Sequence, residues 1–510
     1  MRLPVKDALT DREIQSGLRT LIKEGLASQV MVSLTMGVFL VAFALKLGAS
    51  NTTIGLLAAI PSLAQLVQIP AIYLIEKVRN RRAISVYALA GARLFWVPIG
   101  LIPFLFSVEA GLAFLILALL IRSSLAAVGI ASWNSWMRDL VPSDSLGTFF
   151  SKRLTLMTAM AIPLSLAAGY YIDFWKRAYP SLELQGYSFL FFIGGLIGLL
   201  GVEFISRIPE PRMAQVREKL NIWRMISEPF KDANFKNLIV FLGSWSFAVN
   251  LAAPFFTVYM LKRLELEMSF IILLAVVSQL MSMAFFRLWG GFADRFSNKS
   301  VLQVSGPLFI GCILAWTFTT MPERHLFTLP LLFVIHILMG ISAAGVAIGA
   351  GNIGLKLSPK GKGTAFLATI SLINSLAAGI GSILGGKFAD FFAERELSWT
   401  IRWIGPNREL AFQTLNLQQW DFFFILAFLI GLYSLHRLVM VKETGEVKEK
   451  IVVRELLSEL GRVTRSLSTA GGMRHLTQYS FSVARAVLRR GRRKGSSSQY
   501  GKKEKKPKES

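Results

Sequence analysis

The sequence has few charged residues, one cysteine and four histidines in a chain of 510 residues. Charged residues make up 17% of it, whereas a water-soluble domain carries about 25%. Cys312 alone cannot form an intrachain disulfide, and the histidines lack the spacing of a metal site. No nucleophile motif, Walker sequence or dinucleotide fingerprint occurs. We therefore expect neither an enzyme nor a resident metal or cofactor.

The chain is rich in long runs of apolar residues. Apolar residues make up 53% of the chain, and the mean hydropathy is +0.51. A membrane helix needs about 20 mostly apolar residues, and strands of a membrane barrel would be half as long with strict alternation. The sequence therefore predicts an all-α membrane protein with twelve transmembrane helices, at 26–48, 53–75, 83–107, 111–136, 150–173, 186–207, 236–261, 268–292, 300–321, 328–353, 364–391 and 420–441.

The second half of the chain repeats the first at an offset of about 218 residues. Asn134 corresponds to Asn352, and Leu140-Val141-Pro142 corresponds to Leu357-Ser358-Pro359. Two further pairs are Gly169-x-x-x-Asp173 with Gly386-x-x-x-Asp390, and the basic run after Glu76-Lys77 with the one after Asp294-Arg295. The repeat predicts two six-helix units in one chain, an arrangement used by carriers that rock about a central site.

Lysine and arginine positions predict the topology. The connection at 47–52 has no cation, whereas the connection at 76–82 and the long one between the halves have several. Because cytoplasmic loops are enriched in these residues, we expect both termini in the cytoplasm and the chain in the inner (plasma) membrane. The expected organisation is an amphipathic N-terminal segment at 1–25, helical halves at 26–207 and 236–443, a linker at 208–235 and a basic tail at 444–510.

The C-terminal tail carries much of the net charge. Residues 444–510 contain 17 Lys or Arg against 6 Glu. A basic amphipathic stretch at 449–467 predicts a helix on anionic membrane lipid. No recognition fold accompanies the charge, so we expect no nucleic-acid partner. We expect a monomer.

One loop sequence resembles a known family. Between the eighth and ninth apolar runs, Gly290, Asp294, Arg295 and Lys299 match the loop motif of the major facilitator superfamily. The first-half copy has Ile72 in place of the glycine and Glu76 in place of the aspartate, while Lys77 and Arg81 keep the positive charge. The resemblance covers residues 10–443. It implies that the motif acid pairs with cations and a helix end when the inner gate is shut. Such charge-assisted bonds can form in one state and break in another. The alternative is a solvated loop that only sets the topology.

The same resemblance assigns positions to the helices. The family places its second, fifth, eighth and eleventh helices at the seam between the halves. Gly169 and Asp173 then lie at the outer end of the fifth helix, and Gly386 and Asp390 at the outer end of the eleventh. Small residues allow helices to approach closely in lipid, which predicts packing between the halves at these positions.

Polar residues inside the apolar runs indicate where a substrate binds, because a charge near the bilayer centre costs about 2.5–3.5 kcal/mol on insertion scales. Arg122 and His336 fall near the middle of the fourth and tenth runs, which line the cavity in the resembled family. Arg93 falls on the third run, which favours a structural role. Neutral polar candidates for the site are Gln65, Asn250, Gln279 and Asn374.

By these boundaries, no Asp or Glu lies in the middle of any run. Buried cations without a buried anion predict a negatively charged or polar solute, moved by secondary active or facilitative transport. Either His336 takes part in proton coupling, or the carrier uses the substrate gradient or another ion. Alternatives are a lipid or drug exporter on the same fold, and a membrane sensor or assembly protein that acts through its tails without transport.

Overall fold

The structure is a computed structural model, and it describes residues 5–7, 9–142, 146–213, 227–320, 324–359, 363–405, 409–447 and 449–468. The chain divides into two units, Met1–Glu446 and Val447–Ser510. Most of the basic tail and the amphipathic part of the linker, at 214–226, lie outside the described residues. In the second unit, α18 (Glu449–Ser468) confirms the helix expected at 449–467.

The described residues contain twelve helices long and apolar enough to cross a membrane, as the sequence predicts. The first six spans are formed by α1 (Asp11–Thr35) with α2 (Val38–Lys46), α3 (Asn51–Ala64) with η1 (Gln65–Val67) and α4 (Gln68–Val78), α5 (Arg81–Leu94) with α6 (Trp96–Gly100) and α7 (Ile102–Leu105), α8 (Val108–Leu140), α9 (Leu146–Ala178), and α10 (Glu183–Ser206), which follows η2 (Pro180–Leu182).

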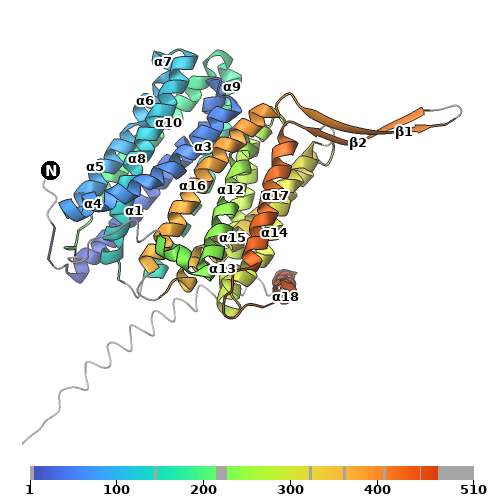
Figure 1. Ribbon diagram of the computed structural model, residues 1–510. Helices are drawn as coiled ribbons and strands as arrows, with labels where there is room; N and C mark the ends of the chain where they lie inside the picture. The colour runs from blue at the N-terminus through green and yellow to red at the C-terminus, as the bar shows by residue number, and fades with distance from the viewer. Residues whose placement is uncertain are drawn as a thin grey trace, which may run out of the picture. The chain divides into compact units, whose positions relative to one another are not determined.

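The second six spans follow a short helix, η3 (Glu228–Lys231). They are formed by α12 (Ala233–Lys262), α13 (Met268–Arg295), α14 (Asn298–Ala315) with η4 (Trp316–Thr319), α15 (Thr328–Leu357), α16 (Gly363–Phe391) and α17 (Trp420–Val439). Figure 1 shows both sets of helices running roughly parallel to one another.

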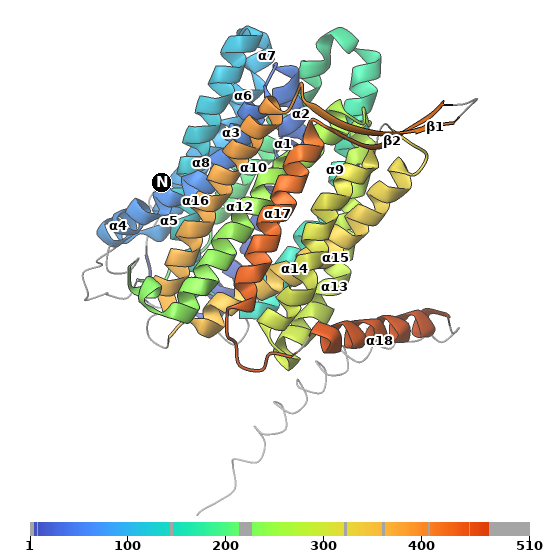
Figure 2. The ribbon, with the colours of Figure 1, turned by 45° about the vertical axis from the view of Figure 1, so that its right-hand side comes forward.

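The helices define two sides of the bundle. We call the side where α1 begins and α17 ends the terminal side. The opposite side carries a β-hairpin of β1 (Glu396–Ile404) and β2 (Glu409–Gln418), which pair antiparallel with an irregularity at Trp399/Thr400, and we call it the hairpin side. Figures 1 and 2 show the hairpin projecting from the ends of α16 and α17.

The first span begins earlier than its apolar run indicates. Thr10 caps α1, and Glu13 completes the capping box that the Thr10-x-x-Glu13 spacing predicts. The helix then continues without interruption from Asp11 to Thr35. It breaks at Met36 and Gly37 before α2 starts at Val38, so the first span consists of two helices.

A buried carboxylate holds the start of the third span in the first half. Glu210, in the Pro209-Glu210-Pro211 segment after α10, is fully buried. Its oxygens accept the backbone N–H groups of Arg81 (2.7 Å) and Arg82 (3.0 Å) at the first turn of α5. The Arg81 side chain, also fully buried, donates to Glu210 at 3.3 Å and to Asp139. Because the first N–H groups of a helix lack intrahelical acceptors, Glu210 fixes α5 to the end of the sixth span.

The second half contains the same arrangement. Glu443, after α17, accepts the backbone N–H groups of Asn298 (3.3 Å) and Lys299 (2.7 Å) at the first turn of α14. Lys356 approaches the same carboxylate at 2.9 Å. The buried Lys299 ammonium donates to Glu446 at 2.7 Å. Arg81 and Lys299 therefore lie in the first turn of a membrane helix, where they bond within their own half.

We predict that Glu210→Gln lowers the melting temperature of the purified protein in detergent. The amide nitrogen cannot accept an N–H group, and the buried Arg81 keeps only the exposed Asp139 as a carboxylate partner. A buried donor that is left without an acceptor costs about 1–3 kcal/mol. Glu203→Gln is the matched control, because Glu203 pairs with Arg207 on the surface at 2.9 Å and such pairs contribute about 0–1 kcal/mol. Equal melting temperatures for the two variants would contradict the prediction.

Candidate functional site

On the hairpin side, a carboxylate joins the two halves. Asp390, near the end of α16, accepts the backbone N–H groups of Asn51 (3.0 Å) and Thr52 (2.7 Å) at the first turn of α3. Gly386 makes the approach possible, because a Cβ atom there would lie 2.4 Å from the carbonyl oxygen of Asn51. Backbone cannot yield to such a contact, so only glycine allows α3 and α16 to meet at this point.

The corresponding contact on the other side of the seam joins α9 to α13. Asp173, which is buried, accepts the backbone N–H groups of Met268 (3.0 Å) and Ser269 (2.8 Å) at the first turn of α13. Gly169 lies one turn earlier, where a Cβ atom would be 2.7 Å from the side chain of Ile272. The two Gly-x-x-x-Asp sequences thus place their acids on helix N-termini of the opposite half, where negative charge is favourable.

Between the halves lies a cavity of about 1130 Å³. It lies between α1, α2 and α9 of the first half and α13, α14 and α15 of the second. Apolar side chains form most of its lining, among them Val32, Phe39 and Phe286. Gln29, Ser33 and Gln279 are among the neutral polar residues that line it, together with Arg287, the one charged residue found in the described lining. Its lining extends from the middle of the bundle toward the terminal side, whereas the Asp173 and Asp390 contacts lie on the hairpin side.

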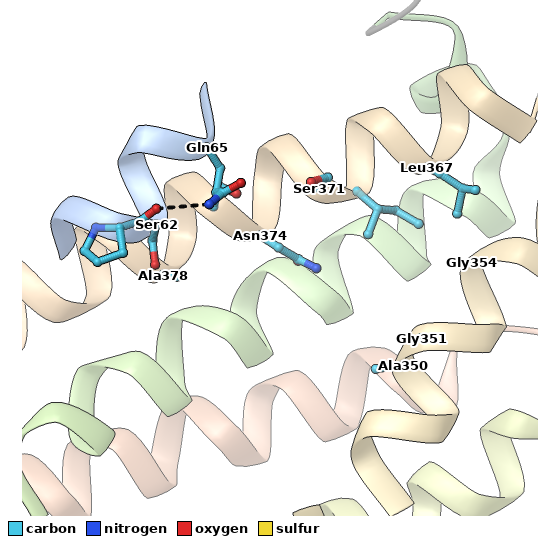
Figure 3. A pocket seen from close by; sticks show the side chains of 12 residues that line it. Ser62, Gln65, Ala350, Gly351, Gly354, Leu367, Ser371, Asn374 and Ala378 are labelled. Atoms are coloured by element: carbon cyan, nitrogen blue, oxygen red, sulfur yellow. Dashed lines mark hydrogen bonds between the residues drawn. The ribbon is translucent and has the colours of Figure 1, made fainter. Parts of the chain in front are cut away.

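A second cavity, of about 610 Å³, lies between η1, α15 and α16. It brings together two of the predicted site residues, Gln65 and Asn374, with Ser62 and Ser371. Figure 3 shows Gln65 next to α16 and Asn374 extending from α16 toward α15, with the Gln65 amide donating to the Pro61 carbonyl at 3.4 Å. The buried Asn374 amide oxygen has no partner among the described residues.

The two arginines in the middle of spans have opposite surroundings. Arg93 donates to Glu24 (3.0 Å), to Ser28 (2.6 Å) and to the carbonyl oxygen of Gly198 (2.6 Å). Glu24 also accepts from Arg153 at 2.8 Å and is buried. The expectation of buried cations without a buried anion is therefore wrong, since Glu24 falls two residues before the predicted span and inside the observed helix. Arg93 is neutralised, which favours a structural role.

Arg122 is 7% exposed and has no ion-pair partner in the part of the chain that the structure describes. Its guanidinium carbon lies 4.6 Å from the ring centre of Trp96. Its Nη2 is 3.8 Å from the sulfur of Met36, and its Nε has no partner among the described residues. Arg122 does not itself line either cavity, but Met36 lines the larger one.

His336 occupies a related position in the second half. Its ring packs edge-on against Trp316, with 5.5 Å between ring centres, and its Nδ1 bonds to the carbonyl oxygen of Leu332 at 2.8 Å. His336 is 7% exposed and lines neither cavity. Asn250 donates to the carbonyl oxygen of Ser246 on its own helix at 2.8 Å and also lies outside both linings. The substrate role expected for His336 and Asn250 stays a prediction.

The residues of the two loop motifs have different surroundings and do not form one cluster. Gly290 lies within α13, and Asp294 is exposed, with no ion pair or hydrogen bond to another described residue. Arg295 lies over the ring of Phe296 at 5.1 Å. In the first half, Glu76 is half-buried and Lys77 exposed. The gating role that the resemblance implies for Asp294 stays a prediction.

Two functional candidates were missed by the sequence analysis. Arg287 lies inside the predicted span 268–292 and lines the larger cavity, and a charge within an apolar run was the available signal. The break at Gly37 was missed because a glycine within an apolar run gives no signal for a positive φ.

The fold and the seam define a multi-pass membrane protein of two helical halves that enclose a cavity. A family model described as Major Facilitator Superfamily matches residues 25–382, and the chain belongs to this superfamily. No curated protein sequence is similar enough to count as a match.

Solved transporter structures share the fold. A mutant of the nucleoside transporter NupG has 14% identity and a TM-score of 0.63, covering 84% of this chain and 100% of that chain. A bacterial homologue of the human lysosomal transporter Spinster, inward-facing and unoccupied, has 18% identity and a TM-score of 0.54, with coverage of 76% and 84%. A POT family transporter in complex with 5-aminolevulinic acid has 11% identity and a TM-score of 0.58, with coverage of 86% and 99%. At these identities the likeness shows the fold alone.

We predict that Gly386→Ala separates the halves on the hairpin side, because the new methyl group would meet backbone atoms of Asn51 and Thr52 at 2.4 and 2.8 Å. Spin labels at Phe106 and Phe391, in a Cys312→Ser background, should report a longer distance by double electron–electron resonance. Gly311→Ala is the matched control, since nothing lies within 4 Å of its added Cβ atom. A distance distribution identical to that of the unsubstituted protein would count against the seam.

Proposed function

We propose that this chain is a secondary carrier that moves a small solute across the inner membrane by alternating access. The observation that carries the proposal is the asymmetry of the seam. Asp173 and Asp390 join the halves on the hairpin side, while a cavity of about 1130 Å³ lies between them toward the terminal side. Carboxylate bonds to helix ends can part without unfolding either helix, so the same contacts can open that side while the other closes.

The contacts at Glu210 and Glu443 support the same mechanism from within each half. Each of these acids ties the third span to the segment after the sixth span of its own half. A half that is stapled in this way can move as one body. Rocking then needs to break only the seam contacts, which fits a rigid-body transition between two packed states.

The lining of the cavity favours an amphiphilic solute with a polar or anionic group. Its walls are largely apolar, with Arg287 and neutral polar side chains at intervals. Binding sites of this kind take an apolar body and fix it with a few polar contacts. The same lining keeps a lipid or drug exporter as a second candidate, because it lies between α9 and α13 at the seam.

The proposed orientation places the terminal side in the cytoplasm. The basic connections predict it, and the structure then corresponds to an inward-open state. We further propose that the tail after Glu446 binds anionic membrane lipid, and that the protein is a monomer which carries out no chemistry on its solute. The competing function, a sensor that acts through its tails, makes a different prediction for truncation.

We predict that a chain ending at Glu446 retains solute flux. Glu446 is kept because it holds the buried Lys299 at 2.7 Å, whereas the removed residues form a separate unit. Metabolite profiling of a deletion strain identifies the solute, and flux is measured in proteoliposomes with the full and shortened chains. Absence of flux from the full chain would sink the transport proposal. Loss of function on truncation alone would favour the sensor.

A further inference from the structure

The break in the first span exposes helix ends in the middle of the bundle. α1 ends at Thr35, and α2 starts at Val38. Gly37 has φ 62° and ψ −127°, a conformation in the positive-φ region that favours glycine. It is exposed, and an added Cβ atom would meet nothing within 4 Å. Irregular backbone at membrane depth is tolerated where it lines a cavity, and Gly37 lines the larger one.

The N-terminus of α2 has free donors that face this cavity. The N–H groups of Val38, Phe39 and Leu40 have no acceptor within the helix, and no side chain caps them. α2 runs toward the hairpin side, so its N-terminal end faces the terminal side, where the cavity extends. That end carries a partial positive charge. Gly37, Val38 and Phe39 all line the cavity.

A buried cation reaches the same break. The Arg122 guanidinium is 3.8 Å from the sulfur of Met36, the residue directly before the Gly37 cap. A guanidinium has five donors and a thioether is a weak acceptor, so this is a poor environment for a buried charge. Arg93, at similar depth, has a carboxylate, a hydroxyl and a carbonyl as acceptors. Arg122 therefore lacks the anion that its neighbour has.

We propose that Arg122 and the N-terminus of α2 bind the carboxylate or phosphoryl group of an amphiphilic solute. The inference rests on the proposed transport function, because it places the solute in the carrier's cavity. Met36 lines the cavity and contacts the guanidinium, so it stands where the anion must approach. A flexible methionine can move aside, after which the anion accepts from Arg122 and from the α2 amides.

The charges around the break favour an anion over a cation as the bound group of the solute. The carbonyl end of α1 lies at the same break and by itself would attract a cation. Arg122 opposes that, and Arg287, exposed in the cavity lining, adds a second positive charge. The described lining has no acidic residue. The apolar walls then hold the rest of the solute.

The test uses 4-phenylbutyrate and phenyl phosphate as probes, with neutral 4-phenylbutyramide as the matched control. The rise in melting temperature of the full chain in detergent is titrated at fixed ionic strength, because a ligand that binds the folded state stabilises it. We expect at least one anionic probe to stabilise the protein and the amide to have little effect. Equal stabilisation by the amide, or none by either anion, would overturn the proposal.

Variants locate the effect. Arg122→Gln should weaken binding of the anionic probe about tenfold or more, as expected for a lost charged hydrogen bond. Arg153→Gln should leave the affinity unchanged, since Arg153 contacts Glu24. Val38→Pro removes one α2 amide at a position that tolerates proline, and should weaken binding where Val38→Ala does not. Met36→Leu, which removes the thioether, should bind the probe at least as tightly.

If Arg122→Gln fails to fold, the affinity of Val38→Pro for the anionic probe tests the site instead. Wild-type affinity in both variants would refute the site. A parallel titration with phosphatidylglycerol against phosphatidylcholine distinguishes the source of the anion: an Arg122-dependent rise with the first lipid alone assigns the site to a lipid headgroup. Because the readout is binding in detergent, it is independent of flux. Binding without flux contradicts only the transport proposal, and flux without binding contradicts only the anion site.

Discussion

The structure depends on one interaction, a carboxylate that accepts two backbone N–H groups at the start of a membrane helix. Hydrocarbon offers those N–H groups no partner, and an anion at a helix N-terminus is favourable. Glu210 and Glu443 make this interaction within each half. Asp173 and Asp390 make it across the seam. The first pair makes each half a unit, and the second pair sets which side is closed.

Glu210 and Glu443 each have a neighbouring cation, but the two cations come from non-equivalent positions in the two halves. In the first half, Arg81 lies between Glu210 and Asp139. The positions 217 residues later hold Asn298 and Lys356, and there Lys356 approaches Glu443 at 2.9 Å. A cation thus remains beside each carboxylate although it comes from a different helix.

The two arginines in the middle of spans, Arg93 and Arg122, have different roles. Arg93 and Arg122 look alike in sequence, yet Arg93 is held by Glu24 and Ser28 while Arg122 has only Trp96 and the sulfur of Met36. Burying a charge without a counter-ion is costly, so the surroundings of Arg122 favour binding of an anionic ligand. The break at Gly37 supplies the neighbouring donors.

The sequence by itself determined the twelve spans, because hydrocarbon thickness imposes a length that any apolar run must meet. The repeated Gly-x-x-x-Asp spacing paired Asp173 with Asp390, and the family resemblance placed their helices at the seam between the halves. Tertiary structure alone decided the partners: Glu24 reaches Arg93 from 69 residues away, and Glu210 reaches Arg81 from 129. Which arginine is neutralised, which carboxylate caps which helix and where the first span breaks depend on neighbours distant in sequence, and periodicity carries no information about them.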